Sequence, residues 1–318
     1  MTNFADRLHT SIVKTQSFIV AGFDPILESL PECFLSLGNK KQSTEEAIFE
    51  VLVAFYEKSV VTLAGKVAAI KPNIAFFEQY GIGGLRAFER VCSIVKENKI
   101  PLIIDAKRGD IGSTAQAYSS AFLGKTKVFG KQYSWIDADA VTVNPFLGFD
   151  TIDPFVKDCK DFGKGLFVLV RTSNPGSNTI QGLHETNTRN EISEIVAAWI
   201  SKNGAEFVGT CGFSGIGAVV GAPYPAVAQK LRSIMPKALL LIPGMGAQGG
   251  SATDAVAGFG RGAEGKIGGA IVNLSRGLMS TFSQPPKSVE EFCVALKDNA
   301  DKYNAELIAA VDKVSALR

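Results

Sequence analysis

The sequence predicts an α/β protein in which residues 1–318 form a single-domain (β/α)8 TIM barrel. This prediction depends on eight short apolar runs, on helical stretches between several of them, and on the absence of a dinucleotide-binding motif after the first run. Runs that are apolar on both faces are typical of buried parallel strands. A chain of 318 residues suits one such barrel, and no linker or low-complexity tract divides it.

Each predicted strand ends in polar residues, glycine or proline. The strands cover residues 17–24, 66–73, 100–110, 138–145, 165–173, 216–225, 238–246 and 268–277. Strands that alternate with helices favour a closed barrel over an open doubly wound sheet. A GxGxxG motif after the first strand would favour the open sheet, and the chain lacks it there, although residues 244–250 are rich in glycine.

The connections between the strands include several helical patterns. Helices are predicted over residues 44–64, 85–98, 189–203 and 224–235, and a closing helix pair is predicted from Val289 to Arg318. The long segments 25–43, 115–137 and 174–205 are predicted to contain extra loops.

Composition excludes several classes of function. A net charge of +2 gives no electrostatic reason to expect nucleic acid or an anionic membrane as a partner. Five scattered cysteines form no CxxC pair and only two histidines are present, so neither a disulfide framework nor a metal site is predicted. No apolar run reaches the roughly 18 residues of a membrane span, and the N-terminus has no signal-peptide pattern. We therefore expect a soluble cytoplasmic protein.

Polar and charged residues follow the predicted strands at their C-terminal ends, where barrel enzymes carry their active sites. They are Asp24, Lys71, Asn73, Asp105, Lys107, Asn144, Thr172, Ser173, Gln248 and Arg276. Packing alone does not require charged groups at several strand ends, so these positions predict a functional site.

The segment DAKRGD (105–110) is the densest charged motif. Asp105 and Lys107 are two residues apart on a predicted strand and should point to the same face, close to Lys71 on the neighbouring strand. Gly109 permits a turn that carries Asp110 back to this site or out to a partner. Opposite charges keep such groups ionised. A protonated lysine can donate a proton to a carbanion, and a carboxylate beside it repels a substrate carboxylate, so the array predicts a decarboxylase. A surface salt-bridge cluster is the alternative.

Seven strand-end motifs, in this order, carry a family resemblance. They are GFDP (22–25), KPN (71–73), DAKRGDIGST (105–114), TVNPFLG (142–148), RTSNPGS (171–177), PGMGAQGG (243–250) and NLSRG (273–277). Together they resemble the orotidine 5′-monophosphate decarboxylases, over about residues 17–280, and most closely the longer microbial subgroup. The DxKxxD pattern alone is shared with a wider superfamily of phosphosugar decarboxylases.

The resemblance implies decarboxylation of orotidine 5′-monophosphate to UMP, the last step of pyrimidine (UMP) biosynthesis. It implies that Lys107 donates a proton to C6 of the pyrimidine and that Asp105 lies beside the departing carboxylate. Asp110, with Ile111 and Thr114, would enter the site of a partner subunit, which makes the enzyme a homodimer with shared active sites.

Substrate-binding roles follow from the same resemblance. Lys71 and Asp24 would bind ribose hydroxyls, and Asn73 would contact the ribose or the phosphate side. Ser173 would bind the pyrimidine edge, with Thr172 as the alternate and Asn174 and Asn144 as second choices.

The phosphate would be held by residues after the last two strands. Arg276 supplies a cationic fork, and Gly277 supplies backbone N–H groups if it opens a helix. Pro243 and Gln248 belong to the glycine-rich loop that would close over the phosphate. We expect no cofactor, because no signature of a metal, pyridoxal phosphate or thiamine site is present.

Other interpretations of these residues remain open. Asp24 could be a turn residue before a proline, Thr114 a helix cap, Ser173 a turn hydroxyl and Arg276 a solvated arginine. Arg171 is basic where some relatives carry an acid. Rival functions are a magnesium-dependent phosphosugar decarboxylase of the same superfamily, a non-catalytic nucleotide-binding barrel and, less favoured, a Schiff-base aldolase. We expect orotate phosphoribosyltransferase on a separate polypeptide.

Overall fold

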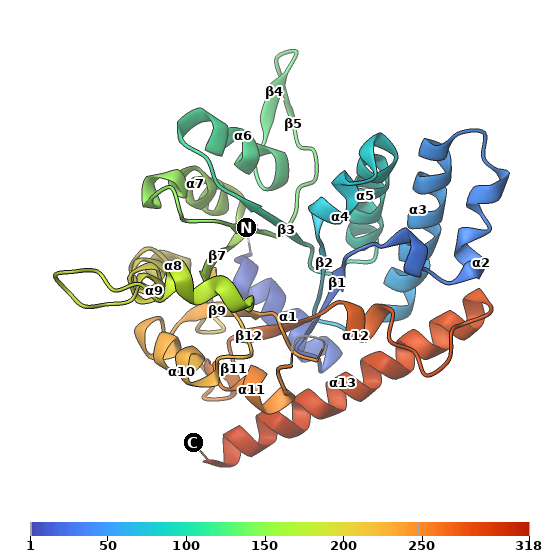
Figure 1. Cartoon of the computed structure of the whole chain (residues 1–318). Coiled ribbons are helices and arrows are strands. Elements are labelled where there is room, and N and C mark those ends of the chain that lie inside the picture. The colour runs from blue at the N-terminus through green and yellow to red at the C-terminus, as the bar shows by residue number, and fades with distance from the viewer. Residues whose placement is uncertain (1, 247–248, 318) are drawn as a thin grey trace.

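Eight parallel strands form the central sheet in the computed structural model, which describes residues 2–246 and 249–317 (Figure 1). The strands are β1 (Ile19–Phe23), β2 (Ala69–Pro72), β3 (Ile103–Arg108), β6 (Ala140–Val143), β7 (Gly165–Arg171), β8 (Ser214–Val220), β9 (Ala238–Ile242) and β12 (Ala270–Leu274). Their order is β2-β1-β12-β9-β8-β7-β6-β3. Bridges between Ile70 and Leu102 and between Asn73 and Asp105 join β2 to β3, so the sheet forms a nearly closed barrel. The predicted fold class and all eight predicted strands are confirmed.

Helices surround the barrel on its outer face or lie at its ends. They are α1 (Phe4–Thr15), α2 (Glu32–Leu35), α3 (Thr44–Leu63), α4 (Ile74–Glu78), α5 (Gly81–Glu97), α6 (Gly112–Phe122), α7 (Asp153–Phe162), α8 (Asn178–Gln181), α9 (Ile192–Asn203), α10 (Pro225–Ile234), α11 (Ala252–Val256), α12 (Arg276–Met279) and α13 (Val289–Leu317). The four predicted helices between strands correspond to α3, α5, α9 and α10. Among the described residues, no helix is both long and apolar enough to cross a membrane.

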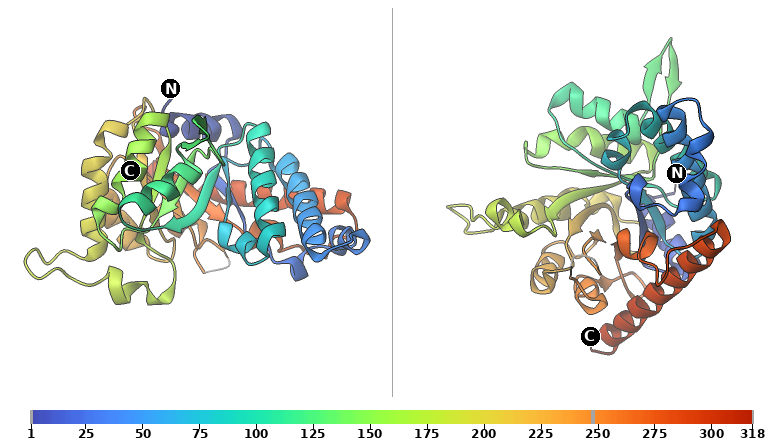
Figure 2. Two further views of the ribbon diagram at one scale, coloured as in Figure 1. Left: turned by 90° about the horizontal axis from the view of Figure 1, so that it is seen from above. Right: turned by 45° about the vertical axis from the view of Figure 1, so that its right-hand side comes forward.

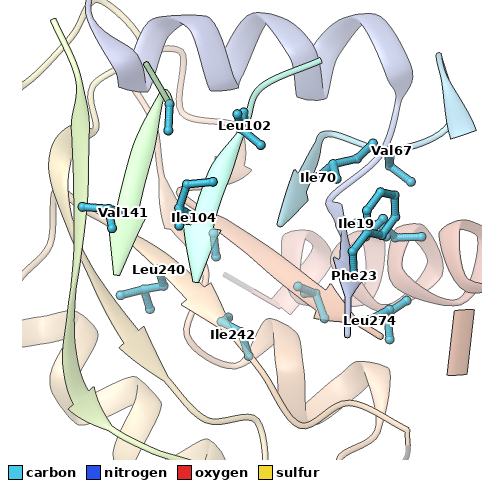
Figure 3. Close-up of a cluster of buried hydrophobic side chains, with 14 of the residues drawn as sticks. Ile19, Phe23, Val67, Ile70, Leu102, Ile104, Val141, Leu240, Ile242 and Leu274 are labelled. Atoms are coloured by element: carbon cyan, nitrogen blue, oxygen red, sulfur yellow. The ribbon is translucent and has the colours of Figure 1, made fainter. Parts of the chain in front are cut away.

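Alternate residues of the strands belong to two buried clusters. Outward-facing side chains such as Ile19, Ile70 and Ile104 pack beneath the helices (Figure 3). Inward-facing side chains such as Ile103 and Phe167 form a second cluster inside the barrel. Burial on both faces explains why the strands read as continuous apolar runs in the sequence.

Helix α1 closes the N-terminal end of the barrel. Its residues Phe4 and Leu8 belong to the inner cluster, and the Phe4 ring meets the Phe167 ring edge-on at 6.0 Å between centroids. A Cβ atom on Gly165 would lie 2.0 Å from the Phe4 ring, so the strand needs glycine at that position. With this end plugged by apolar side chains, the C-terminal ends of the strands are left to form a site.

Two predictions about the connections are wrong. The tail is one continuous helix, α13, rather than a helix pair, because residues 289–317 contain no glycine or proline that would break it. The segment 115–137 is mostly ordered structure rather than loop: it holds most of α6 and a hairpin of β4 (Thr126–Val128) and β5 (Lys131–Tyr133). Figure 2 shows this hairpin projecting away from the barrel. Segments 25–43 and 174–205 likewise contain the short helices α2 and α8.

Candidate active site

A cavity of about 550 Å³ opens at the C-terminal ends of the strands. Most of the residues predicted from the strand ends line it, and they come from six different strand ends: Asp24, Lys71, Asn73, Asp105, Lys107, Thr172, Ser173, Pro243, Arg276 and Gly277. Asn174, a second-choice contact, also lines it. Gln248 lies outside the described residues. The barrel therefore brings together the polar residues that the sequence placed at separate positions.

The cavity contains a cluster of three charged side chains. The Lys71 ammonium donates to Asp105 Oδ2 at 2.7 Å, and the Lys107 ammonium donates to Asp105 Oδ1 at 2.5 Å. Lys71 and Asp105 are buried, with 4% and 8% of their surface exposed, whereas the Lys107 side chain is about half exposed. A cluster at this depth is not the surface salt bridge that was the alternative.

The pKa values of the cluster follow from its charges. Burial alone would raise the pKa of Asp105, but the positive charges and hydrogen bonds of Lys71 and Lys107 hold it well below its usual range. Burial would lower the pKa of Lys71, but the negative charges of Asp105 and Asp24 outweigh burial and raise it. Both side chains therefore stay ionised at neutral pH.

An irregularity in β3 presents Lys107 to the cavity. The backbone of Lys107 has a φ of 48°, in the left-handed region that bulky residues rarely adopt. Such conformations cost of order 1–3 kcal/mol and concentrate at functional sites. Lys107 and Asp105 do meet as predicted, but through this local distortion rather than through the regular alternation of a strand.

One wall of the cavity carries hydrogen-bond acceptors that the described residues leave unpaired. Asp24 Oδ1 and Asn273 Oδ1 are buried, and neither accepts a hydrogen bond from any residue that the structure describes. A Cβ atom on Gly22 would lie 2.0 Å from Ser275 Oγ and 3.0 Å from Asn273 Oδ1, so glycine is required for this wall to form. Buried acceptors of this kind suit the hydroxyl donors of a ligand.

The opposite wall is the loop after β7. The Thr172 hydroxyl is already engaged with Asn174 at 2.6 Å and with Gln181 at 2.9 Å. The Ser173 hydroxyl makes no hydrogen bond to any described residue. Of the two predicted pyrimidine contacts, Ser173 is therefore the one whose hydroxyl is free for a ligand, and Thr172 holds the loop in shape.

Arg171, at the end of β7, supports the same loop from behind. Its guanidinium is buried, donates to Asn178 Oδ1 at 2.9 Å, and lies 5.0 Å from the centre of the Tyr224 ring. These contacts tie the loop after β7 to α8 and to the start of α10. Arg171, which is basic where some relatives carry an acid, therefore has a structural role in this chain: it holds the loop after β7 against α8 and α10.

Arg276 and Gly277 lie where α12 begins, next to Pro243 and Gly244 at the cavity wall. The helix opens at Arg276, one residue earlier than the prediction that placed its start at Gly277. The Arg276 side chain is exposed and forms no ion pair with a described residue. A cation beside the first backbone N–H groups of a helix can hold an anion.

Comparison with known proteins identifies the family. The sequence model of the orotidine 5′-phosphate decarboxylase / HUMPS family matches residues 55–292. The chain belongs to this family. It is 41% identical over 255 residues to the orotidine 5′-phosphate decarboxylase of Caldicellulosiruptor bescii, an alignment that covers 80% of this chain and 83% of that protein.

Solved structures of family members have the same architecture. The OMP decarboxylase of Leishmania donovani has a TM-score of 0.69 and 28% identity, and the match covers 98% of this chain and 99% of that one. The UMP synthase of the same organism has a TM-score of 0.71 and 29% identity. This match covers 98% of the chain but only 57% of the synthase, which is therefore the longer protein.

Three residues that the family resemblance placed at the site do not line the cavity of their own chain. Asp110 lies on the loop before α6, where its Oδ1 accepts from the Ile111 N–H at 2.7 Å. Ile111 is 63% exposed, and Thr114 is exposed in the first turn of α6. Ile111 is the residue that precedes this helix, so the interpretation of Thr114 as its cap is wrong. Asn144, the other second choice, also lies outside the cavity lining.

Residues that the sequence did not single out also line the cavity. Thr142 comes from the middle of β6, and Asn273 and Ser275 come from the end of β12. Thr142 is the single hydroxyl in the apolar strand AVTV, and Asn273 is the single amide in AIVNL. A polar residue within such a strand is the signal that could have identified them. Among the described residues, no three His, Cys, Asp or Glu side chains gather in a group that could hold a metal ion.

Proposed function

We propose that the protein is an orotidine 5′-phosphate decarboxylase that converts orotidine 5′-monophosphate to UMP in the last step of pyrimidine biosynthesis. The buried Lys71–Asp105–Lys107 cluster in the cavity carries this proposal. Membership of the family, together with relatives named for this activity, supports it.

The proposed chemistry uses two of the three charges of this cluster in turn, first Asp105 and then Lys107. The substrate carboxylate lies beside ionised Asp105, and two like charges about 4 Å apart repel by roughly 4 kcal/mol at an effective dielectric near 20. The bond from C6 to the carboxylate breaks, CO2 leaves, and the electron pair stays on C6. Lys107 then donates its proton to C6 and recovers one from solvent. Its ammonium also stabilises the developing carbanion before the proton moves.

The remaining polar groups of the cavity are proposed to hold the nucleotide. Asp24 and Lys71 bind the ribose hydroxyls, which gives the unpaired Asp24 Oδ1 a donor. Asn73 assists on the ribose or phosphate side. Ser173 binds the pyrimidine edge, since its hydroxyl is free while that of Thr172 is not.

The phosphate is proposed to bind at the start of α12. Arg276 and the backbone of Gly277 contact it there, and Pro243 forms the adjoining wall. Gln248 stays a prediction for the same side. Enzymes typically lower barriers by about 8–23 kcal/mol, more than one lysine supplies, so part of this binding energy must serve the chemical step. We propose that no metal or organic cofactor takes part.

Direct assay of the reaction tests the function. We expect the purified protein to consume orotidine 5′-monophosphate, followed by the loss of its absorbance, with equal release of CO2 and UMP and no effect of a chelator. Activity on a keto-sugar phosphate that the chelator abolishes would establish the magnesium-dependent rival. Trapping of a substrate on Lys107 by borohydride would establish an aldolase. Nucleotide binding without turnover would leave only the non-catalytic barrel.

We further propose that the enzyme is a homodimer with shared active sites. Asp110, Ile111 and Thr114 would reach the cavity of the partner subunit, which agrees with their position outside the cavity of their own chain. Exposed apolar side chains follow the neighbouring strand β6: Phe146 is 71% exposed and Leu147 is 52% exposed. Such a patch is typical of a surface that binds another protein.

Mixing two inactive variants tests the shared site. In a mixed dimer of Lys107→Ala and Asp110→Asn chains, one of the two sites would be intact. That site would take its Lys107 from the Asp110→Asn chain and its Asp110 from the Lys107→Ala chain. We expect each variant alone to be nearly inactive and the mixture, refolded together, to regain activity. If Asp110 acts within its own chain, the mixture stays as inactive as its components.

The compartment is proposed to be the cytoplasm. All five cysteines are unpaired, and Cys92, Cys159 and Cys211 are buried as thiols. Free thiols in this number suit a reducing compartment.

A further inference from the structure

Pairing between β3 and β6 breaks at the charged cluster. Ile104 is paired with Val141, and the next paired residues are Arg108 and Val143. The chain therefore takes four residue steps on β3 against two on β6 between these pairs. Asp105 and Lys107 lie in this unpaired stretch of β3. The backbone N–H groups there cannot form regular ladder hydrogen bonds to β6, so they need other acceptors.

Thr142 supplies those partners with its side chain. Its Oγ1 accepts from the Ala106 N–H at 3.1 Å and from the Lys107 N–H at 3.0 Å. The same hydroxyl donates to Asp105 Oδ1 at 3.0 Å. A single oxygen atom on β6 thus takes the place of the missing ladder bonds and reaches the central carboxylate of the site.

These contacts use the full hydrogen-bonding capacity of a hydroxyl. A threonine hydroxyl has one proton to donate and two lone pairs to accept with. Both lone pairs are occupied by backbone N–H groups, so the proton has only the Asp105 carboxylate to point at. Thr142 is 1% exposed, so water does not compete for these bonds. The direction of the hydroxyl is therefore fixed by the fold.

Two of the three residues that Thr142 contacts, Asp105 and Lys107, belong to the charged cluster and must hold a defined geometry. Lys107 holds a left-handed backbone, with a φ of 48°, and its N–H is one of the two that Thr142 binds. Asp105 Oδ1 receives both the Thr142 hydroxyl and the Lys107 ammonium, while Oδ2 receives Lys71. Removal of the hydroxyl would free the Lys107 backbone to relax and would leave Asp105 without one of its three donors.

We propose that Thr142 is a positioning residue for the reaction, because its hydroxyl sets the orientation of the Asp105 carboxylate and holds Lys107 in its left-handed conformation. This inference rests on the roles proposed above for Asp105 and Lys107. Thr142 acts through these residues and takes no part in proton transfer itself. A valine would fill the same space, so packing alone does not require the hydroxyl.

Three variants test the proposal. Thr142→Val removes the hydroxyl at nearly constant volume, and Thr142→Ser keeps it. Thr151→Val is the matched control, because Thr151 is also buried and its hydroxyl donates to one backbone carbonyl, that of Gly148, away from the cavity lining. We expect Thr142→Val to lower kcat about 100-fold, the usual effect of a misplaced reacting group, with little change in the Kd of UMP. Thr142→Ser should recover most of the kcat, and Thr151→Val should behave as the unchanged protein.

The outcomes separate this inference from the proposed function. If the unchanged protein releases no CO2 from orotidine 5′-monophosphate, the proposed function fails. If it does and Thr142→Val keeps full kcat, or Thr142→Ser is as impaired as Thr142→Val, the positioning role is wrong. Equal losses of kcat and UMP affinity would point to general disruption and would also overturn it. Should Thr142→Val fail to fold, Thr142→Ala against Thr142→Ser gives the same comparison.

Discussion

The two sides of the cavity differ in how far the chain satisfies its own polar groups. On the side of β2, β3 and β6, Lys71, Asp105, Lys107 and Thr142 are bonded to one another. On the side of β1 and β12, buried acceptors of Asp24 and Asn273 are unpaired within the described residues, and Arg276 is exposed.

This difference separates the cluster that holds the reacting groups, which includes Lys71 as a partner of Asp105, from the groups that serve binding alone. Groups that stabilise charge in a transition state work best when they are already oriented, because no reorganisation is then needed during the reaction. The β3 side meets that requirement through contacts within the chain. Groups that bind a ligand gain most when the ligand supplies their missing partners, as the β1 and β12 side is arranged to allow.

The largest expected effect comes from removing the lysine of the oriented side. We expect Lys107→Ala to lower kcat by about 10²- to 10⁴-fold, the usual share of a general acid, while UMP still binds. Lys99→Ala is a matched control, because Lys99 is exposed and also has a left-handed backbone, with a φ of 56°. Single-turnover kinetics and a UMP titration measure the two quantities. Full turnover by Lys107→Ala would remove the distinction between the two sides.

A smaller effect is expected on the binding side. We expect Arg276→Ala to lower kcat/KM by about 10- to 100-fold, since hydrogen bonds to a charged group contribute roughly 1.5–3 kcal/mol. Part of this loss should fall on kcat, because binding energy at the phosphate also organises the site. Arg261→Ala is the control, an exposed arginine outside the cavity lining. A rise in KM with unchanged kcat would mean that the two sides work independently.

The sequence predicted the parts of this comparison that depend on local patterns. Apolar runs identify buried strands, and charged residues at their C-terminal ends, such as Asp24 and Lys71, identify the cavity. What it did not predict depends on pairing between strands distant in the chain. The register shift of β3, the left-handed Lys107 and the three bonds of Thr142 arise only when β3 lies beside β6.

The two wrong predictions about the connections have other physical origins. The tail was expected to turn, but residues 289–317 hold no helix breaker, and one continuous helix packs against α3, α11 and α12, with Phe292, Leu296 and Leu307 in the core. The hairpin of β4 and β5 depends on Phe129 and Gly130, which both have positive φ in a tight turn. Phenylalanine disfavours that conformation, so the local sequence did not signal the turn.

The smallest effect should come from a glycine that neither side of the comparison includes. A Cβ atom on Gly221 would lie 2.9 Å from Ser173 Cα and 3.0 Å from Ser173 Cβ, so Gly221→Ala should push the loop after β7 into the cavity. Overpacking of about 1 kcal/mol corresponds to a roughly fivefold rise in KM, with kcat nearly unchanged because the Lys107 cluster is untouched. Gly215→Ala in β8 is the matched control, since its nearest contact would be an ordinary 3.5 Å. If kcat fell instead, Ser173 would belong to the oriented side, and the line between catalysis and binding would have to move to include the loop after β7.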